Sequence, residues 1–315
     1  MSQRHNDDPI VIGLVNNMPD GALQTTERQF TELLGAASGD IAVRLRLFSL
    51  PELPRADASR AYISQHYEAF DNLRIGRIDG LIVTGTEPRA PTLIDEPYWL
   101  SLTGLIDWAE EHTVSTIWSC LAAHAAVYHL DGIRRQKFPE KLSGVFDCTK
   151  ASDHSIVANA PAQWGFPHSR HNDLPEKALI AGGYQILSRS PLAGADMFMK
   201  QRKSLFLFLQ GHPEYDPGSL LREYQRDVGR FLRSERDAYP QMPHGYFDAD
   251  SAAAFTAFRT RALLQRRADL LTEFPAVGLD GKLSHSWRAP AVRIYANWLT
   301  QLVNSRFQPR HAANE

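Results

Sequence analysis

One stretch, residues 114–130, constrains the fold more than any other part of the chain. Its first five residues, Val-Ser-Thr-Ile-Trp, are largely β-branched and apolar, which is typical of a buried strand, whereas residues 121–130 are alanine-rich with apolar side chains at helical spacing. Cys120 stands between them. A thiol at a turn from a parallel strand into a helix lies where the first free N–H groups of the helix lower its pKa and can hold an oxyanion. The stretch alone predicts either a nucleophilic cysteine or one that fills the core.

A second stretch, further along the chain, favours the nucleophile. Residues 205–209 form an apolar run that leads directly into Gln-Gly-His-Pro-Glu. In an extended chain His212 and Glu214 point to the same side, so that Glu214 can orient the imidazole of His212. A cysteine, a histidine and an acid at the carboxyl ends of strands form the arrangement that a catalytic triad requires. We therefore predict Cys120 as nucleophile, His212 as general base and Glu214 as the residue that orients it.

Apolar runs alternate with helical patterns along the chain. Strands are predicted at residues 10–15, 41–48 and 81–83, and helices at residues 99–109 and after a capping box formed by Thr26 and Gln29. This alternation predicts an α/β fold with a doubly wound, mostly parallel, flavodoxin-like sheet, in which ligands bind where the carboxyl ends of the strands meet the loops. Residues 141–146 and 167–172 are polar and are interpreted as loop-like pieces between short strands.

Composition excludes several classes of function. The chain has 315 residues, of which 43% are hydrophobic and 22% charged, which suits a globular protein with a sizeable core. Its net charge of −2 leaves no basic excess for nucleic acid or a membrane surface, so small-molecule partners are expected. The two cysteines, Cys120 and Cys148, fit a reducing compartment. Neither a signal peptide nor a membrane span of ~20 apolar residues is recognised, so the cytoplasm is the expected location.

Short motifs along the chain carry a resemblance to a known family. They are Asn17-Met18-Pro19 with Thr26 and Gln29, residues 80–85 (GLIVTG), Tyr98-Trp99, residues 141–146 (KLSGVF), residues 167–171 (PHSRH), residues 211–216 (GHPEYD), residues 223–227 (EYQRD), Ser286-Trp287-Arg288 and Asn297-Trp298-Leu299. In this order they resemble the homoserine O-acyltransferase family, which has the class I glutamine amidotransferase fold and makes O-succinylhomoserine or O-acetylhomoserine for methionine synthesis. The resemblance implies a single domain over residues 1–315 with a C-terminal helical extension, and a homodimer.

The resemblance also implies roles for individual residues. Cys120 takes up the acyl group as a thioester, and Lys141, Ser169 and Arg226 line the substrate site. A guanidinium can grip the carboxylate of an amino acid acceptor with two hydrogen bonds, and a lysine supplies a point charge. Without the resemblance, each of these charged residues would be interpreted as an ordinary surface residue.

The reaction that follows has two halves. The Cys120 thiolate attacks the thioester of acyl-CoA while the backbone N–H groups of Leu121 and Thr86 hold the oxyanion, and CoA leaves. His212 then removes the proton from the hydroxyl of homoserine, which attacks the acyl-enzyme and releases the ester. Acyl-CoA is a co-substrate, and no cofactor is expected.

Two positions near the site depart from the family's pattern. After its cysteine the family usually has Trp-Gly-Ala-Gln, whereas this chain has Leu-Ala-Ala-His; His124 either reaches the site or, as we favour, is structural. The position that governs acyl choice falls on Arg89, where acetyl-CoA users have Glu and succinyl-CoA users Gly. A cation there complements the free carboxylate of a succinyl group, so succinyl-CoA is the predicted donor. If the loop shifts register, Glu87 takes the position and acetyl-CoA becomes the predicted donor.

A third departure is a helical insertion at about residues 248–283, where the family has a short connector. Residues 251–274 are rich in Ala, Leu and Arg, and Phe255, Phe258 and Leu263 belong to an apolar stripe. The insertion covers the active site, extends a dimer interface or packs on the outside, which is the commonest fate of insertions. Either of the first two could change the acceptor, so serine or another hydroxy amino acid is an alternative to homoserine.

Other functions fit the sequence less well. A glutaminase or amidase of the same fold would use the same triad, but the chain carries the acyltransferase motifs at both ends. A non-catalytic binding module is disfavoured because all three triad residues are present. Metal chemistry is not expected, since the twelve histidines show no ligand spacing beyond His212 and Glu214. His168 and His171 are interpreted as pocket or core residues.

Overall fold

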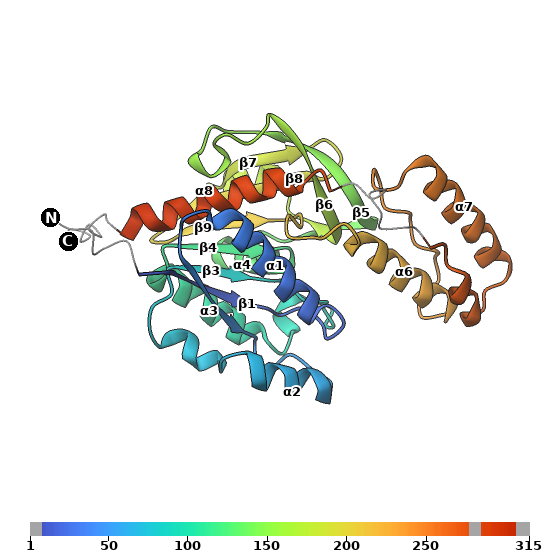
Figure 1. Ribbon diagram of the computed structural model, residues 1–315, viewed down its shortest axis with the longest axis horizontal. Coiled ribbons are helices and arrows are strands. Elements are labelled where there is room, and N and C mark those ends of the chain that lie inside the picture. The colour runs from blue at the N-terminus through green and yellow to red at the C-terminus, as the bar shows by residue number, and fades with distance from the viewer. Residues whose placement is uncertain (1–7, 277–284, 307–315) are drawn as a thin grey trace.

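The computed structural model describes residues 8–276 and 285–306. In these residues nine strands form one sheet with the order β2-β1-β3-β4-β9-β8-β7-β5-β6 (Figure 1). The parallel half consists of β1 (Ile10–Val15), β2 (Val43–Phe48), β3 (Gly80–Val83), β4 (Ser115–Ser119) and β9 (Leu205–Leu209). The antiparallel half adds β5 (Gln136–Lys150), β6 (Gln163–Asp173), β7 (Gln185–Ser190) and β8 (Gly194–Gln201). The predicted doubly wound α/β class is confirmed, and the parallel pairing holds for the half that was recognised in the sequence.

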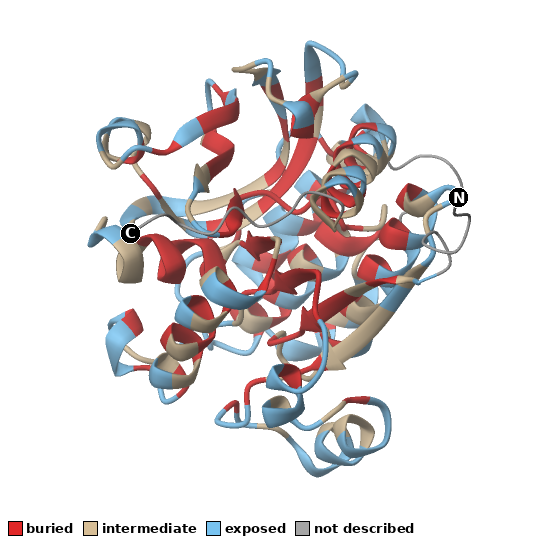
Figure 2. Ribbon diagram, turned by 90° about the vertical axis from the view of Figure 1, so that its left-hand side faces the viewer, coloured by how far each residue is buried: buried red, intermediate tan, exposed pale blue. Residues whose placement is uncertain are grey.

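Helices cover both faces of the sheet. Their bounds are α1 (Leu23–Ser38), α2 (Asp57–His66), α3 (Trp99–His112), α4 (Leu121–Asp131), α5 (Glu176–Ala181), α6 (Ser219–Leu232), α7 (Ala249–Leu264) and α8 (Arg288–Arg306), with short 3-10 turns at η2 (Phe70–Arg74), η3 (Leu93–Asp95), η4 (Ser155–Val157) and η5 (Ala268–Glu273). Side chains of α1 and α8 share one core cluster, and those of α3 and α4 share another. Because successive strand residues point to opposite faces, Ile117 belongs to the first cluster and Trp118 to the second. The buried residues accordingly gather along the strands and on the helix faces turned toward them (Figure 2).

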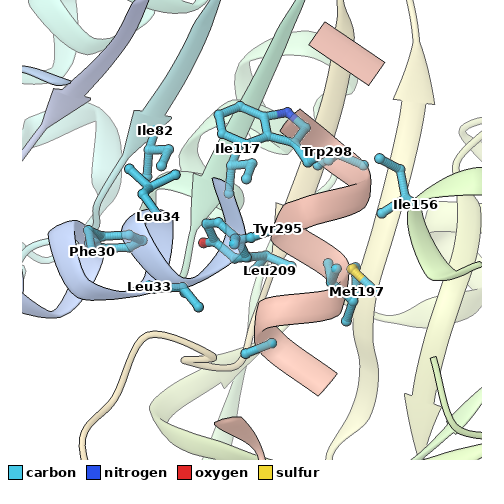
Figure 3. Packing of buried hydrophobic residues seen from close by; sticks show 14 of the residues in the cluster. Phe30, Leu33, Leu34, Ile82, Ile117, Ile156, Met197, Leu209, Tyr295 and Trp298 are labelled. Carbon is cyan, nitrogen blue, oxygen red and sulfur yellow. The ribbon is translucent and has the colours of Figure 1, made fainter. Parts of the chain in front are cut away.

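The C-terminal helix α8 lies against the centre of the parallel half. Tyr295 and Trp298 are fully buried between α1 and the strands (Figure 3). The indole N–H of Trp298 donates a 2.9 Å hydrogen bond to Ser115 Oγ at the start of β4. A Cβ on Gly80 of β3 would lie 2.8 Å from the Trp298 ring, so the glycine allows α8 to approach the sheet closely. The predicted C-terminal helical extension is therefore part of the core.

Two local predictions were wrong. Thr26 and Gln29 form no capping box, because α1 begins one turn earlier, after Ala22, and both side chains are buried. Gln29 instead donates a 2.7 Å hydrogen bond to Ser219 Oγ of α6. Residues 141–146 and 167–172 are not loops but paired segments in the long strands β5 and β6. Polar side chains suggested loops, but several of these side chains are polar because they face a cleft instead of the core.

The predicted insertion packs on one face of α6. Phe255 and Phe258 of α7 and Leu270 of η5 form a core cluster with Tyr224 and Phe231 of α6. Figure 1 shows α6 and α7 side by side at one end of the molecule. Residues 277–283 of the predicted insertion lie outside the described residues. Among the described residues, no helix is both long and apolar enough to span a membrane.

The docking of α8 makes a stability prediction. We expect Trp298→Ala to lower the free energy of unfolding by about 3–5 kcal/mol, because it leaves a large cavity and removes a buried hydrogen bond. Trp298→Phe, which keeps most of the packing, should cost less. Denaturant unfolding of the two variants and the wild type measures both values. If both variants lose the same free energy of unfolding, packing of the ring against the sheet is not the main contribution of Trp298 to stability.

Candidate active site

Cys120 lies at the strand-to-helix turn that the sequence predicts. It caps the N-terminus of α4 with φ 53° and ψ −115°, a conformation that residues other than glycine rarely adopt. Its backbone N–H donates a 2.7 Å hydrogen bond to Leu209 O at the end of β9, and its carbonyl accepts from Ala123 N at 3.0 Å. The turn is therefore held from both sides in a strained geometry of the kind that clusters at functional sites.

His212 and Glu214 lie on the segment that follows β9, beside Cys120. The His212 Nδ1 and Glu214 Oε1 atoms are 2.8 Å apart, and the two side chains are almost fully buried. The imidazole stacks on Tyr215, with ring centroids 4.3 Å apart. Because Nδ1 is engaged by the carboxylate, Nε2 is the ring atom available to Cys120. The structure thus brings the three predicted triad residues together.

Charges at the site control the protonation of His212. Burial alone would lower the pKa of His212, but the charges of Glu214 and Cys120 and their hydrogen bonds to the ring outweigh it and raise the pKa well above its ordinary value. The protonated imidazole can donate a proton, and the neutral ring can accept one. The pair can therefore work as nucleophile and proton carrier.

Free backbone N–H groups lie beside Cys120. Among the described residues, the N–H groups of Leu121 and Thr86 have no hydrogen-bond acceptor. A Cβ on Gly85 would lie 2.9 Å from Leu121 N, so the loop after β3 approaches the start of α4 closely. Both residues line the same cleft as Cys120. These two N–H groups have the surroundings that an oxyanion hole needs.

The cleft is large and polar on one side. Its volume is about 940 Å³, which suits a substrate the size of an acyl-CoA headpiece together with an amino acid. The predicted residues that line it are Cys120, Leu121, Thr86, His212, Glu214, Lys141, Ser169 and Arg226. No residue of α7 or η5 lines it within the described part of the chain. The insertion therefore does not cover this cleft, although it supports α6, which forms one wall.

Lys141, Ser169 and Arg226 belong to a charge network that the sequence analysis missed. Lys141 Nζ lies 3.1 Å from Glu223 Oε2 and 2.9 Å from Asp227 Oδ2. Ser169 Oγ donates to the same Glu223 oxygen, and Arg226 pairs with Asp227 at 3.1 Å. Burial opposes ionisation of both acids, but Lys141 and the other donors outweigh it, and each carboxyl has a lowered pKa.

The two acids are four residues apart on α6. They therefore lie on one face of the helix, and the motif at residues 223–227 was a signal that could have identified them. Tyr215 completes the network, since its hydroxyl donates a 2.5 Å hydrogen bond to Glu223 Oε1.

Arg89 and Glu87 occupy different positions. Arg89 lines an adjoining pocket of about 300 Å³ that shares Thr86 and Glu87 with the cleft, and Arg89 does not line the cleft itself. Glu87 borders both cavities and forms an ion pair with Arg230 at 3.0 Å. The role predicted for Arg89 in acyl choice stays a prediction.

His124 lies in α4 and is almost fully buried. Its Nε2 atom is 2.8 Å from Gln210 Oε1. Burial, with a smaller effect of the Arg170 charge, lowers the pKa of His124 to about 3, so the ring is neutral near pH 7. The structural role that we favoured agrees with this contact, although one side of the ring reaches the cleft.

A second polar cluster lies under the His212 turn. Ligand atoms of Cys148, His168 and Asp196 all lie within 4.8 Å of one another and are buried. Asp196 Oδ2 accepts a 2.6 Å hydrogen bond from Ser188 Oγ. Burial, followed by the charge of Asp196, raises the pKa of the Cys148 thiol, which disfavours the thiolate that a metal ion binds. The expectation of no metal chemistry stays an expectation.

Comparison with known proteins places these features in a family context. A family model described as homoserine O-succinyltransferase matches residues 1–308. A homoserine O-succinyltransferase of Rhodopseudomonas palustris is 50% identical over 295 residues, which cover 94% of this chain and 89% of that protein. A homoserine O-succinyltransferase of Bradyrhizobium japonicum is 46% identical over 300 residues, which cover 94% of this chain and 92% of the relative. In fold, the chain is similar to a glutamine amidotransferase from Methylobacillus flagellatus, with a TM-score of 0.53, 14% identity and coverage of 98% and 99% of the two chains.

The coupling between Cys120 and His212 can be measured. We expect Cys120→Ser to lower the pKa of His212, because the variant removes the negative charge that stabilises the imidazolium. NMR titration of the imidazole ring protons reports this pKa directly. His154 is the control: its pKa is lowered by burial alone, so it should titrate identically in both proteins. An unchanged His212 titration would contradict the coupling between Cys120 and His212.

Proposed function

The chain belongs to the homoserine O-succinyltransferase family, and from this premise we propose that it moves a succinyl group from succinyl-CoA to the hydroxyl of L-homoserine through a thioester on Cys120. The family match over residues 1–308 and relatives at 45–50% identity support an enzyme that succinylates homoserine. They do not favour an acetyl donor, a serine acceptor or a glutaminase activity. The observation that carries the proposed route is the strained turn at Cys120, with His212 and free N–H groups around it.

In the first half-reaction, Cys120 Sγ attacks the thioester carbon of succinyl-CoA. The N–H groups of Leu121 and Thr86 donate to the developing oxyanion, which lowers the barrier because no reorganisation is needed at that moment. The bond to the CoA sulfur breaks, and the protonated His212 supplies a proton to the departing thiolate. Succinyl then remains on Cys120 as a thioester.

In the second half-reaction, the acceptor enters the charge network. Lys141 and Arg226 supply two positive charges and Glu223 and Asp227 two negative ones, a balance that suits a zwitterionic amino acid. The carboxylate of homoserine would be held by the cations, and its ammonium group by the acids. Neutral His212, oriented by Glu214, then takes the hydroxyl proton while the oxygen attacks the thioester carbon. The bond between that carbon and Cys120 Sγ breaks, which releases O-succinylhomoserine and leaves the Cys120 thiolate beside protonated His212. Ser169 keeps Glu223 in position in this arrangement.

The remaining expectations concern the cofactor requirement, location, oligomeric state and kinetics of the protein. The reaction as written needs succinyl-CoA as co-substrate and no further cofactor. We infer a cytoplasmic location, which is supported by two unpaired cysteines and by the biosynthetic role of the family's product. A homodimer is proposed on the family resemblance. Kinetics of the ping-pong type follow from the thioester on Cys120.

Intact mass spectrometry tests the proposed route. Purified protein is exposed briefly to succinyl-CoA or acetyl-CoA in separate tubes, with Cys120→Ala as control. We expect a succinyl adduct that is absent from the variant and is discharged when L-homoserine is added. An acetyl adduct formed faster than the succinyl adduct would reverse the choice of donor. No adduct with either donor, at a concentration that supports turnover, would contradict the covalent route.

The oxyanion-binding groups can be tested separately. We expect Gly85→Ala to lower the rate of acylation about 10²-fold or more, because the added Cβ would lie 2.9 Å from Leu121 N and crowd the oxyanion. Gly35→Ala is the control, since its added Cβ meets no atom within 4 Å. Stopped mixing followed by mass analysis of the acyl-enzyme measures the rate. If Gly85→Ala acylates as fast as Gly35→Ala, the oxyanion is held elsewhere.

A further inference from the structure

We propose that Arg135 binds the free carboxylate of the succinyl group and thereby selects the acyl donor. The inference rests on the proposed function, because it assumes a succinyl thioester on Cys120. It assigns donor choice to a residue between α4 and β5, which belongs to none of the motifs that carry the family resemblance.

Arg135 lines the same cleft as Cys120 and is only partly exposed. Within the described part of the chain its guanidinium makes no hydrogen bond, ion pair or cation–π contact. Every other lysine or arginine that lines the cleft has a protein acceptor. The pairs are Lys141 with Glu223 and Asp227, Arg170 with Asp173, Arg222 with Asp216, Arg226 with Asp227, Arg230 with Glu87, and Arg236 with the carbonyl of Ala238. Arg135 is therefore the cation whose hydrogen-bonding groups are still available to a ligand.

The electrostatic surroundings of Arg135 connect it to the reacting sulfur. Burial lowers its pKa, while electrostatic interactions with Tyr98, Glu96 and Cys120 act in the opposite direction, so all three groups lie close enough to influence it. A partly desolvated guanidinium without a partner is unfavourable, and a carboxylate ligand would remove that cost. The planar guanidinium also matches a carboxylate with two parallel hydrogen bonds.

Two polar atoms of residues that interact electrostatically with Arg135 have no partner, and both residues, Tyr98 and Glu96, line the adjoining pocket instead of the cleft. The hydroxyl of Tyr98 and Oε2 of Glu96 are buried and make no hydrogen bond to any described residue. Tyr98 can donate a hydrogen bond to a bound carboxylate, whereas Glu96 opposes it by like charge. Glu96 Oε1 is occupied by the backbone N–H groups of Arg89 and Ala90, at 2.7 and 2.8 Å. The Tyr98 hydroxyl is therefore a second donor that is available where the cleft adjoins that pocket.

This position discriminates between donors more directly than Arg89 does. Arg89 is exposed and lines the adjoining pocket, whereas Arg135 lines the cleft that contains the sulfur. An acetyl group has no carboxylate and gains nothing from Arg135. The arginine should therefore accelerate transfer from succinyl-CoA and leave transfer from acetyl-CoA unaffected.

The experiment compares acylation of Cys120 by succinyl-CoA and by acetyl-CoA in single-turnover reactions followed by intact mass. We expect Arg135→Gln to slow succinylation about tenfold to a hundredfold, as for the loss of a charge-assisted pair, with acetylation changed less than twofold. Arg135→Lys should retain part of the preference because it keeps the charge. Arg134→Gln is the matched control, since Arg134 is the exposed neighbour and lines neither cavity. Thermal unfolding verifies that all variants fold.

Each alternative outcome overturns the inference in a recognisable way. An equal loss with both donors would place Arg135 on the CoA moiety. A succinyl preference that survives Arg135→Gln but is lost in Arg89→Gln would assign donor choice to Arg89. If wild-type Cys120 takes up no succinyl group at all, the proposed function itself fails.

Discussion

The pairing of β4 with β9 is the constraint on which the active site depends. Ser119 faces Leu209 in this parallel ladder, and the next N–H along β4, that of Cys120, donates to the Leu209 carbonyl. The same two strand ends therefore hold the nucleophile and deliver the segment that carries His212. Because side chains alternate along a strand, a slip of one residue would turn every buried side chain of β9 to the opposite face. The tightly packed apolar residues on both faces of β9 thus determine where His212 lies.

Helix α6 joins the site to the insertion. One face carries Glu223 and Asp227 toward the cleft, and the neighbouring face packs Tyr224 and Phe231 against the insertion. Five charged residues of α6 line the cleft, and without the packing of Tyr224 and Phe231 the helix would lose fewer contacts on moving. Packing against α7 restricts that movement, since displaced aromatic side chains would leave cavities. The insertion thus lies on the outside, yet it helps to position the charge network.

The parts of the fold that could be predicted are those with strong local signals. The buried strands β1, β3 and β9 are largely continuous apolar runs, β4 is short and contains β-branched residues, and the turn at Cys120 follows from a strand that meets a helix. The long strands β5 and β6 were missed because cleft-facing polar residues interrupt their pattern. No role could be assigned to Glu223 or Arg135 from the sequence, because the role of each depends on whether groups from distant segments pair with it. A free guanidinium can be recognised only when its neighbours are known.

The cleft contains two different charge environments, and the proposed reaction uses both. In the network around Glu223 the positive and negative side chains are paired with one another, so a simple anion would bind there only weakly. A zwitterion can replace these pairs, because its carboxylate can bind the cations and its ammonium group the acids. Arg135 is not neutralised by contact and suits a carboxylate that carries no compensating ammonium group. In the proposed two-step transfer the succinyl tail would have to stay in place while CoA leaves and homoserine enters. A separate site at Arg135 would keep the acyl-enzyme ordered without occupying the acceptor's network, and the unpaired cation indeed lies apart from the residues of β5, β6 and α6.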